Sequence, residues 1–458
     1  MIYSSLVVTL KEIAWLFRYR KEVRNAVRFY YNYYASIKQK PLVKELSDGV
    51  SAFIVSDGKI KKVNREKLDK CVLCCIQNCI TATNKATDIL TLSLRVNSFS
   101  VGPIFNGVEV KSKKLSYTYF KYVIEYLYNY GYIDLTLGYS IKGKYGVVNN
   151  KSSSIKILEP FVDILKPYLS SDDYDSSKVL SCVVLKDEKG KPKAFRVVSK
   201  VKHYIESMNA YNSVFKDRVK LGDETLEIFF CRIFKNTFSE FGRYNERMSN
   251  FQTLKPDTRK QIMIDGEPIV EIDFNSLHTS ICYSSLCVDI PSEFGDKFDP
   301  YTIELKGYSD FTNRKLGKLC MMALLNTTSR RSALGVINAE IQEDRDLVVN
   351  KGGKSNFGFE LKDFDKIIKV SEALDLTYER NVAIEEYFFK DNSKWLQNKE
   401  SEIAEYVVSY FSQRNEPCLC IHDSFIVKER LADTLEKAMI DGFSEVVGFK
   451  QNCKVSRK

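Results

Sequence analysis

Two aspartates far apart in the sequence, Asp273 and Asp423, have surroundings that suit metal-dependent chemistry. Asp273 belongs to the stretch 267–283, EPIVEIDFNSLHTSICY, in which apolar residues alternate around it as they do in a half-buried strand. From Asn275 onward the apolar spacing becomes helical. The pattern therefore predicts a strand that ends just after Asp273 and turns into a helix.

Asp423 lies in the stretch 417–427, PCLCIHDSFIV, where two apolar runs flank His422, Asp423 and Ser424. This pattern predicts a strand, a tight turn that presents Asp423, and a second strand. Two such carboxylates can bridge two Mg²⁺ ions held about 3.5–4 Å apart, and Mn²⁺ can substitute, which is the arrangement used for phosphoryl transfer. Aspartates are also common at strand ends and turns for purely structural reasons.

A helix is predicted over 312–330, TNRKLGKLCMMALLNTTSR, with a polar face and an apolar face. Its polar face carries Arg314, Lys318, Met322 and Asn326 at intervals of four residues, and leucine, cysteine and alanine cover the other side. This face is either an ordinary solvated surface or a cationic stripe for an anionic substrate. Its charged members are all basic, which favours the second interpretation.

Five motifs occur in an order that resembles the palm and fingers of the family A DNA polymerases and of the related single-subunit phage RNA polymerases. They cover roughly the segment 239–427 and are Gly242-Arg243, Asp273, Arg314 with Lys318, Gln397, and His422-Asp423. In that superfamily the Gly-Arg motif touches the template-primer and motif A supplies a metal-binding Asp. Motif B is RxxxK on the fingers helix, a Gln-bearing helix follows, and motif C is HD.

The resemblance implies an α+β fold, a right-hand polymerase with an antiparallel palm sheet, helical fingers and a mainly helical N-terminal region. Asp273 and Asp423 would bind two Mg²⁺ ions, Arg314 would neutralise the triphosphate of a bound nucleotide, and Lys318 would protonate the leaving pyrophosphate. The residues expected to contact the template-primer are Gly242, Arg243, Arg259, Gln397 and His422.

The chain departs from the family pattern around the nucleotide. Met322 and Asn326 stand where the DNA polymerases usually have aromatic residues, and motif C reads HDSF, as in the RNA polymerases. His278, five residues after Asp273, stands where the DNA polymerases carry Glu and the RNA polymerases Gly. Because an imidazole would crowd a ribose 2′-hydroxyl, DNA synthesis is favoured, with an RNA polymerase or primase as the alternative.

The composition suits a globular protein with a polyanionic partner, because 458 residues with 44% hydrophobic and 28% charged residues carry a net charge of +10. The expected partners are a template-primer and nucleoside triphosphates. A cytoplasmic location is expected, since the first residues lack the features of a signal peptide and no apolar run approaches the ~20 residues of a membrane span.

Twelve cysteines without a secretory leader suggest reduced thiols. Four of them are close together, Cys71, Cys74, Cys75 and Cys79, but no second Cys or His pair follows nearby to complete a zinc site. Buried helix thiols are therefore favoured over metal ligands.

Four regions are predicted: a basic helical region over 1–105, a possible winged helix over 106–150, a thumb-like or linking region over 151–235, and the palm and fingers over 236–458. The possible winged helix offers four lysines to phosphates, Lys113, Lys114, Lys142 and Lys144, although a generic helix and hairpin fits equally well. No paired DxE motif indicates a proofreading exonuclease. The last, basic residues are expected to be disordered.

Two rival functions remain at this point. A non-catalytic replication initiator would use the winged helix and keep a decayed polymerase core, but the retained aspartate pair argues against it. A two-metal nuclease would need more carboxylates around the ions than these strands supply.

Overall fold

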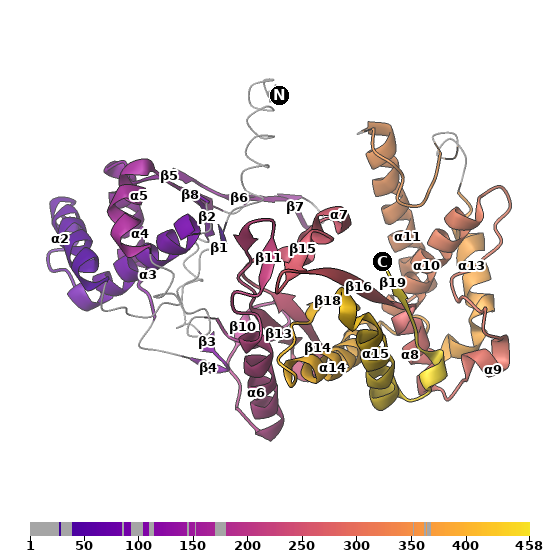
Figure 1. The fold of residues 1–458 in the computed structure, drawn as a ribbon. Helices are drawn as coiled ribbons and strands as arrows, with labels where there is room; N and C mark the ends of the chain where they lie inside the picture. Colours follow the sequence, from indigo (N-terminus) through magenta and orange to yellow (C-terminus); the bar gives the residue numbers. More distant parts are fainter. Residues whose placement is uncertain are drawn as a thin grey trace, which may run out of the picture. The chain divides into compact units, whose positions relative to one another are not determined.

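A computed structural model describes residues 27–28, 39–84, 87–92, 104–109, 114–143, 146–151, 153–169, 180–350, 352–360, 363 and 368–458. The chain forms two compact units, Met1–Ser181 and Cys182–Lys458 (Figure 1). Both combine helices with mainly antiparallel sheets, so the predicted α+β class is confirmed. Within the described residues, no helix is long and apolar enough to cross a membrane.

The first unit packs helices against a sheet of strand order β1-β2-β8-β5, in which β1 and β2 are parallel and the other pairs antiparallel. Its helices are α2 (Lys40–Ser56), α3 (Arg65–Asn84), α4 (Tyr117–Asn129), α5 (Glu159–Leu165) and the short η3 (Lys166–Tyr168). Its strands are β1 (Val27–Arg28), β2 (Ile89–Leu92), β3 (Ile104–Phe105), β4 (Val108–Glu109), β5 (Ile133–Thr136), β6 (Tyr139–Gly143), β7 (Gly146–Lys151) and β8 (Ser153–Ile157).

The four clustered cysteines all lie on α3 and are buried in the core of this unit. Burial raises the pKa of Cys71 and of Cys79 to about 12, so these thiols stay protonated and chemically inert. No group of three or more potential metal ligands occurs among the described residues. The structure therefore agrees with the interpretation of the four as buried helix thiols.

The hairpin expected after the tyrosine-rich helix is formed by β6 and β7, which pair antiparallel. It is inserted between β5 and β8, the two strands that pair with each other in the sheet. Lys114 is exposed before α4, and Lys142 lies in β6, where side chains are not described. Lys113 and Lys144 lie outside the described residues.

The second unit contains two sheets, and the smaller has the order β10-β9-β13-β14. Its strands are β9 (Val183–Lys186), β10 (Pro192–Lys193), β13 (Phe230–Lys235) and β14 (Thr237–Glu246), and helix α6 (Ser199–Ser213) packs against β9 and β13. Within the region predicted over 151–235, β9 and β10 form a short hairpin, in which two residues of β10 pair with β9.

The larger sheet has the order β12-β11-β15-β16-β18-β17, and β19 also pairs with β16. Its strands are β11 (Val219–Leu221), β12 (Glu224–Thr225), β15 (Ile262–Ile264), β16 (Glu267–Asn275), β17 (Leu419–Ile421), β18 (Ser424–Lys428) and β19 (Lys454–Arg457). Helix α15 (Ala432–Val447) packs against β16, β18 and β19. The expectation that the last residues are disordered is wrong, because β19 forms hydrogen-bonded pairs with the end of β16.

The remaining helices of this unit include a group formed by α10, α11 and α13, drawn in orange beside the larger sheet in Figure 1. The helices are α7 (Pro256–Arg259), α8 (Leu277–Ser285), α9 (Ile290–Phe294), α10 (Asp310–Asn326), α11 (Arg330–Arg345), α13 (Val370–Arg380) and α14 (Ser393–Ser412). Short helical segments occur at η6 (Phe251–Thr253), η7 (Asp346–Asn350), η8 (Val382–Tyr387), η9 (Glu429–Leu431) and η10 (Lys450–Asn452).

Two predicted boundaries in this group are wrong. The helix expected over 312–330 ends at Asn326, where Thr327 adopts an extended conformation, and Ser329 caps the next helix through its side chain. The charged sequence from Ile341 to Leu361 predicts an exposed loop, but the chain remains helical to Asn350.

Candidate active site

Strand β16 delivers Asp273 to the centre of the larger sheet. Asp273 stands opposite Ser424 of β18 on one side and Ser456 of β19 on the other. The strand ends at Asn275, and Ser276, with φ +56°, turns the chain into α8. The predicted strand-to-helix change just after Asp273 is therefore confirmed.

The turn between β17 and β18 presents Asp423 beside Asp273. His422 has φ +55°, which allows two residues to reverse the chain between Ile421 and Ser424. The amide of Phe274 donates to the carbonyl oxygen of Asp423 at 3.2 Å, so the residue after Asp273 is bonded directly to the turn. Asp273 near the end of β16 and Asp423 in the turn before β18 are thus brought to the same edge of the sheet.

The charge of Asp423 acts on Asp273. Burial raises the pKa of Asp273 to about 6, the negative charge of Asp423 adds to this shift, and the ammonium of Lys458 opposes it. A carboxyl group whose pKa is raised by burial and by a neighbouring carboxylate is a candidate for a functional site. Among the described residues no third side chain of ligand type joins the pair, so a cation there would complete its shell with water and substrate oxygens.

Glu271, two residues before Asp273 on the same face of β16, is held by a buried network. Arg259 donates to both of its carboxylate oxygens, at 2.9 and 3.1 Å, and the Ser424 hydroxyl donates at 2.9 Å. Arg259 is only 9% exposed. Its guanidinium therefore braces the strand that carries Asp273 and does not face solvent, where a phosphate would approach.

Glu400 of α14 connects two of the predicted site residues. His278 Nε2 lies 2.9 Å and Arg243 Nη2 lies 2.5 Å from the same oxygen, Oε2, of this carboxylate. The Glu400 side chain is 3% exposed. Burial by itself would raise the pKa of Glu400, but the hydrogen bond from His278 and the charge of Arg243 outweigh burial and hold it below the ordinary value.

Gly242, the partner of Arg243 in the predicted Gly-Arg motif, is needed for the packing of β14 on α14. Its φ is +91°, and a Cβ there would come within 2.7 Å of both the Phe234 ring and the Ser401 hydroxyl. A larger residue would separate the strand from the helix that carries Glu400. Glycine therefore allows the close packing that positions Arg243, and its contact with the template-primer stays a prediction.

Helix α10 presents the expected stripe to solvent. Arg314, Lys318 and Met322 are exposed, and Asn326 is half-buried. Arg314 pairs with Asp299 at 2.6 Å, whereas no carboxylate of the described chain lies within ion-pair distance of Lys318. Lys318 is thus the cation that remains available to an anion.

The other two residues of the predicted template-primer set differ in exposure. Gln397 lies in the second turn of α14 and is half-buried, although an exposed position was expected, and His422 is exposed at the turn beside Asp423. Their contacts with nucleic acid remain predictions.

Two residues at the site were not identified from the sequence. Glu400 lies three residues after Gln397, and its burial opposite Arg243 carries no local sequence signal. Lys458 Nζ lies 3.1 Å from Asp273 Oδ2, but its segment resembles an ordinary basic tail.

Replacing Glu400 by alanine is expected to lower the free energy of unfolding by about 3 kcal/mol, because it leaves Arg243 and His278 without their buried counter-charge. Urea unfolding at neutral pH measures this difference. The matched control is Glu402→Ala on the same helix, where the half-exposed pair with Lys399 is worth less than about 1 kcal/mol.

The loss of free energy of unfolding caused by Glu400→Ala is also expected to depend on pH. A carboxylate whose pKa is lowered by folding stabilises the protein above its unfolded pKa, near 4.5, and loses this contribution as the pH falls through the lower folded pKa. The difference between wild type and Glu400→Ala should therefore narrow below about pH 4.5. A difference that stays constant into acid would show that packing alone accounts for the effect.

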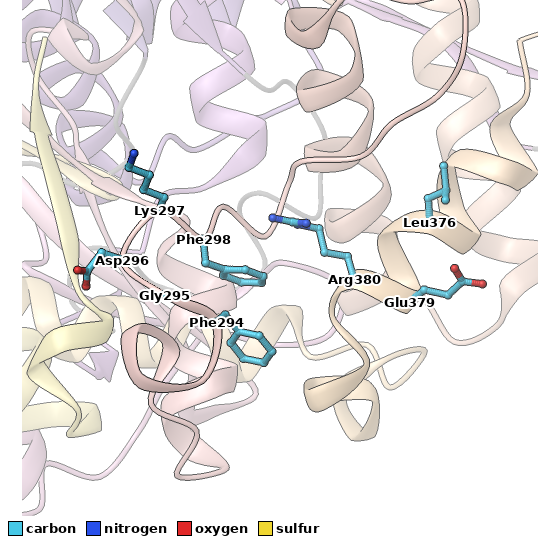
Figure 2. Close-up of a pocket in the computed structure, with 8 residues that line it drawn as sticks. All are labelled: Phe294, Gly295, Asp296, Lys297, Phe298, Leu376, Glu379 and Arg380. Carbon is cyan, nitrogen blue, oxygen red and sulfur yellow. The ribbon is translucent and has the colours of Figure 1, made fainter.

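An open pocket of about 890 Å³ lies elsewhere in this unit, between α9, the loop that follows it and α13. Figure 2 shows Phe294 and Phe298 on one side and Arg380 reaching towards them from α13. None of the residues predicted for the active site lines this pocket. Its two acidic side chains, Asp296 and Glu379, lie on opposite sides in Figure 2, so it lacks a paired carboxylate.

Comparison with known proteins gives little information. No protein-family model and no curated protein matches the sequence. One solved structure that matches is the POL domain of Pol1 from M. smegmatis in complex with DNA primer-template and dNTP, at 12% identity and a TM-score of 0.29. The match covers 56% of this chain and 51% of that one, so the chain spans about half of that domain. A likeness at this level carries no argument about function, so the functional assignment depends on the residues of the site.

Proposed function

We propose that the chain is a template-directed nucleotidyltransferase that extends a primer by two-metal-ion phosphoryl transfer. The observation that supports this most directly is the position of Asp273 on β16 beside the turn that carries Asp423, where burial and then the charge of Asp423 raise the pKa of Asp273. In the form proposed here it is a DNA polymerase of family A type without a proofreading exonuclease. The larger sheet would be the palm, and α10, α11, α13 and α14 would form the fingers.

The donor groups fit Mg²⁺ or Mn²⁺. Magnesium is usually held by one or two carboxylates and completes its shell with waters and substrate phosphates, and Asp273 and Asp423 supply such a pair. When bound, two such ions would supply a nucleophile activated at neutral pH and charge stabilisation for the leaving oxygen.

The residues around the pair have separate roles in this proposal. Lys318, exposed and without an acidic partner in the described part of the chain, neutralises the triphosphate and gives a proton to the leaving pyrophosphate. Arg314 binds the triphosphate after exchanging its partner Asp299 for phosphate. Arg243 and Gln397 contact the template-primer, and His422 contacts the primer end beside Asp423.

Primer extension with Mg²⁺ tests the proposal. A labelled primer on a DNA template, offered dNTPs in one reaction and rNTPs in another, should lengthen with dNTPs. Lengthening with rNTPs alone would favour the RNA polymerase or primase. Retention of the DNA in a gel shift without extension would favour the replication initiator, and shortening of the primer would favour a nuclease.

Replacing His278 by glycine is expected to raise ribonucleotide use relative to deoxynucleotide use by roughly 30-fold, if exclusion of one hydroxyl is worth about 2 kcal/mol. The physical reason is steric, because Glu400 holds the imidazole in one position by its 2.9 Å contact. The kcat/KM ratio for a matched dNTP and rNTP measures the change.

The control is His203→Gly, since His203 is an exposed residue of α6. If the wild-type enzyme already prefers rNTPs, or if His278→Gly leaves the ratio unchanged, His278 does not select the sugar.

For the first unit we propose a second nucleic-acid contact, through a winged helix. The specific observation is the β6–β7 hairpin, inserted between two strands that pair with each other and preceded by α4. In a winged helix, a helix followed by such a hairpin would contact duplex DNA.

Alanine at the four lysines of this region, Lys113, Lys114, Lys142 and Lys144, is expected to weaken binding to duplex DNA of any sequence. The slope of log affinity against log salt should fall by about 1 for each phosphate contact removed. Fluorescence anisotropy over a salt series measures both quantities. The control is Lys61→Ala with Lys62→Ala, which removes two exposed lysines elsewhere in the unit, and equal losses in both variants would contradict the winged-helix proposal.

A further inference from the structure

The residue that follows β19 places an ammonium group on the carboxylates of the candidate site. Lys458 Nζ lies 3.1 Å from Asp273 Oδ2 and 3.2 Å from Glu271 Oε1. The backbone amide of Lys458 also donates to the carbonyl oxygen of Glu271 at 2.9 Å. Main chain and side chain of this residue are thus both bound to the strand that carries Asp273.

Strand β19 holds this lysine in register. Its four residues stand opposite Ile272 to Asn275 of β16. Two of its side chains are fixed at other sites: Arg457 pairs with Asp433 and Glu436 of α15, and Lys454 donates to the carbonyl oxygen of Asp296. The backbone of Lys458 is therefore held in register by the fold, and its side chain, 44% exposed, reaches both carboxylates from this fixed point.

Lys458 compensates a charge that is otherwise left unpaired. Arg259 neutralises Glu271, but among the described residues the cation within ion-pair distance of Asp273 is Lys458. The Asp273 side chain is 24% exposed, so its charge is only partly solvated. The pKa of Lys458 is raised, since the charges of Asp273 and Glu271 outweigh the effect of burial.

We infer that the ammonium of Lys458 is a counter-cation of the carboxylate pair. It is ion-paired with the Asp273 carboxylate in the metal-free protein and is displaced when a divalent cation binds. This inference depends on the metal-binding role of Asp273 in the proposed function. An ammonium ion and a divalent cation compete for the same carboxylate oxygen, so affinity for the metal is lower than the two aspartates alone would give. Metal binding would then release the Lys458 side chain from Asp273, while its backbone stays bonded to Glu271.

The test is Mn²⁺ binding to the full chain, measured by electron paramagnetic resonance of free Mn²⁺ in the absence of nucleotide and DNA. Lys458→Met keeps an unbranched side chain, one atom shorter, and removes its charge, and it is expected to bind Mn²⁺ on the order of tenfold more tightly, which corresponds to about 1.4 kcal/mol. Lys454→Met is the matched control on the same strand and should bind like wild type. In EDTA, Lys458→Met should unfold at a lower temperature than wild type, and Mn²⁺ should raise its unfolding temperature by more.

The outcomes separate this inference from the proposed function. Lys458→Met could bind Mn²⁺ no more tightly than wild type, while Asp273→Asn abolishes binding. This result would overturn the role of Lys458 and leave the metal site intact. Asp273→Asn could bind Mn²⁺ as tightly as wild type, and the double variant Asp273→Asn/Lys458→Met as tightly as Lys458→Met. Either this result or a lack of Mn²⁺ binding by every variant would show that Asp273 is not a metal ligand. Both the inference and the proposed function would then be wrong.

Discussion

Asp273→Asn and Asp423→Asn should each reduce nucleotide addition by roughly three orders of magnitude or more while leaving affinity for template-primer nearly unchanged. Each substitution removes a charged oxygen ligand, and metal-ion stabilisation of a transferring phosphoryl group is worth several kcal/mol, at about 1.4 kcal/mol per factor of ten. The basic side chains that provide phosphate affinity are not altered. Single-turnover primer extension and anisotropy of labelled DNA measure the two properties.

The matched control is Asp223→Asn, because Asp223 is exposed at the turn between β11 and β12 of the same sheet. Thermal unfolding of all three variants verifies that the fold persists. Extension at a near wild-type rate by either active-site variant would disprove the two-metal assignment.

Lys318→Ala is expected to lower the maximal rate of nucleotide addition by about 10²- to 10³-fold with a smaller effect on nucleotide affinity. A positioned cation that donates a proton to the leaving group acts mainly in the transition state, so its loss appears in kcat. Arg314→Ala should instead raise KM for the nucleotide. Arg314 is ion-paired with Asp299 when no nucleotide is bound, and in the proposed function it exchanges this partner for the triphosphate on binding. Rapid-quench measurements across nucleotide concentrations separate the two effects.

Lys315→Ala is the control on the same helix, because the Lys315 ammonium lies over the Phe311 ring and not in the stripe. Unchanged kinetics in a Lys318→Ala/Arg314→Ala double variant would show that the stripe is an ordinary solvated helix face. The polymerase proposal would then lose its nucleotide-binding element, although the carboxylate pair would remain.

The parts of the site that depend on neighbouring residues could be predicted from the sequence. The change of apolar spacing at Asn275 located the end of β16, and the polar triplet between two apolar runs located the turn at Asp423. These features are local, because strand alternation and tight turns are set by the residues that form them. The solvent-facing stripe of α10 followed from helical periodicity in the same way.

The parts that depend on distant residues could not be predicted. Glu400 belongs to the site because it is buried against Arg243 of β14, which is 157 positions away in the sequence. Lys458 belongs to it because strand pairing brings it to Glu271, which is 187 positions away. Arg259 looked available for a phosphate, but it is held by Glu271, which only the folded sheet brings opposite it. The break after Asn326 was missed because Thr327 to Ser329 contain neither glycine nor proline, the residues that usually mark such a boundary.

The uneven burial of the thiols gives this protein a natural labelling site. Of the twelve cysteines, all of which belong to the described residues, Cys287 is exposed, Cys453 is half-buried and the others are buried. A maleimide dye reacts with exposed thiols that can ionise, whereas burial raises the pKa of Cys453 to about 12. Cys287 follows α8, the helix that begins just after Asp273. A fluorophore attached there would report on ligand binding at the active site in the unmutated chain.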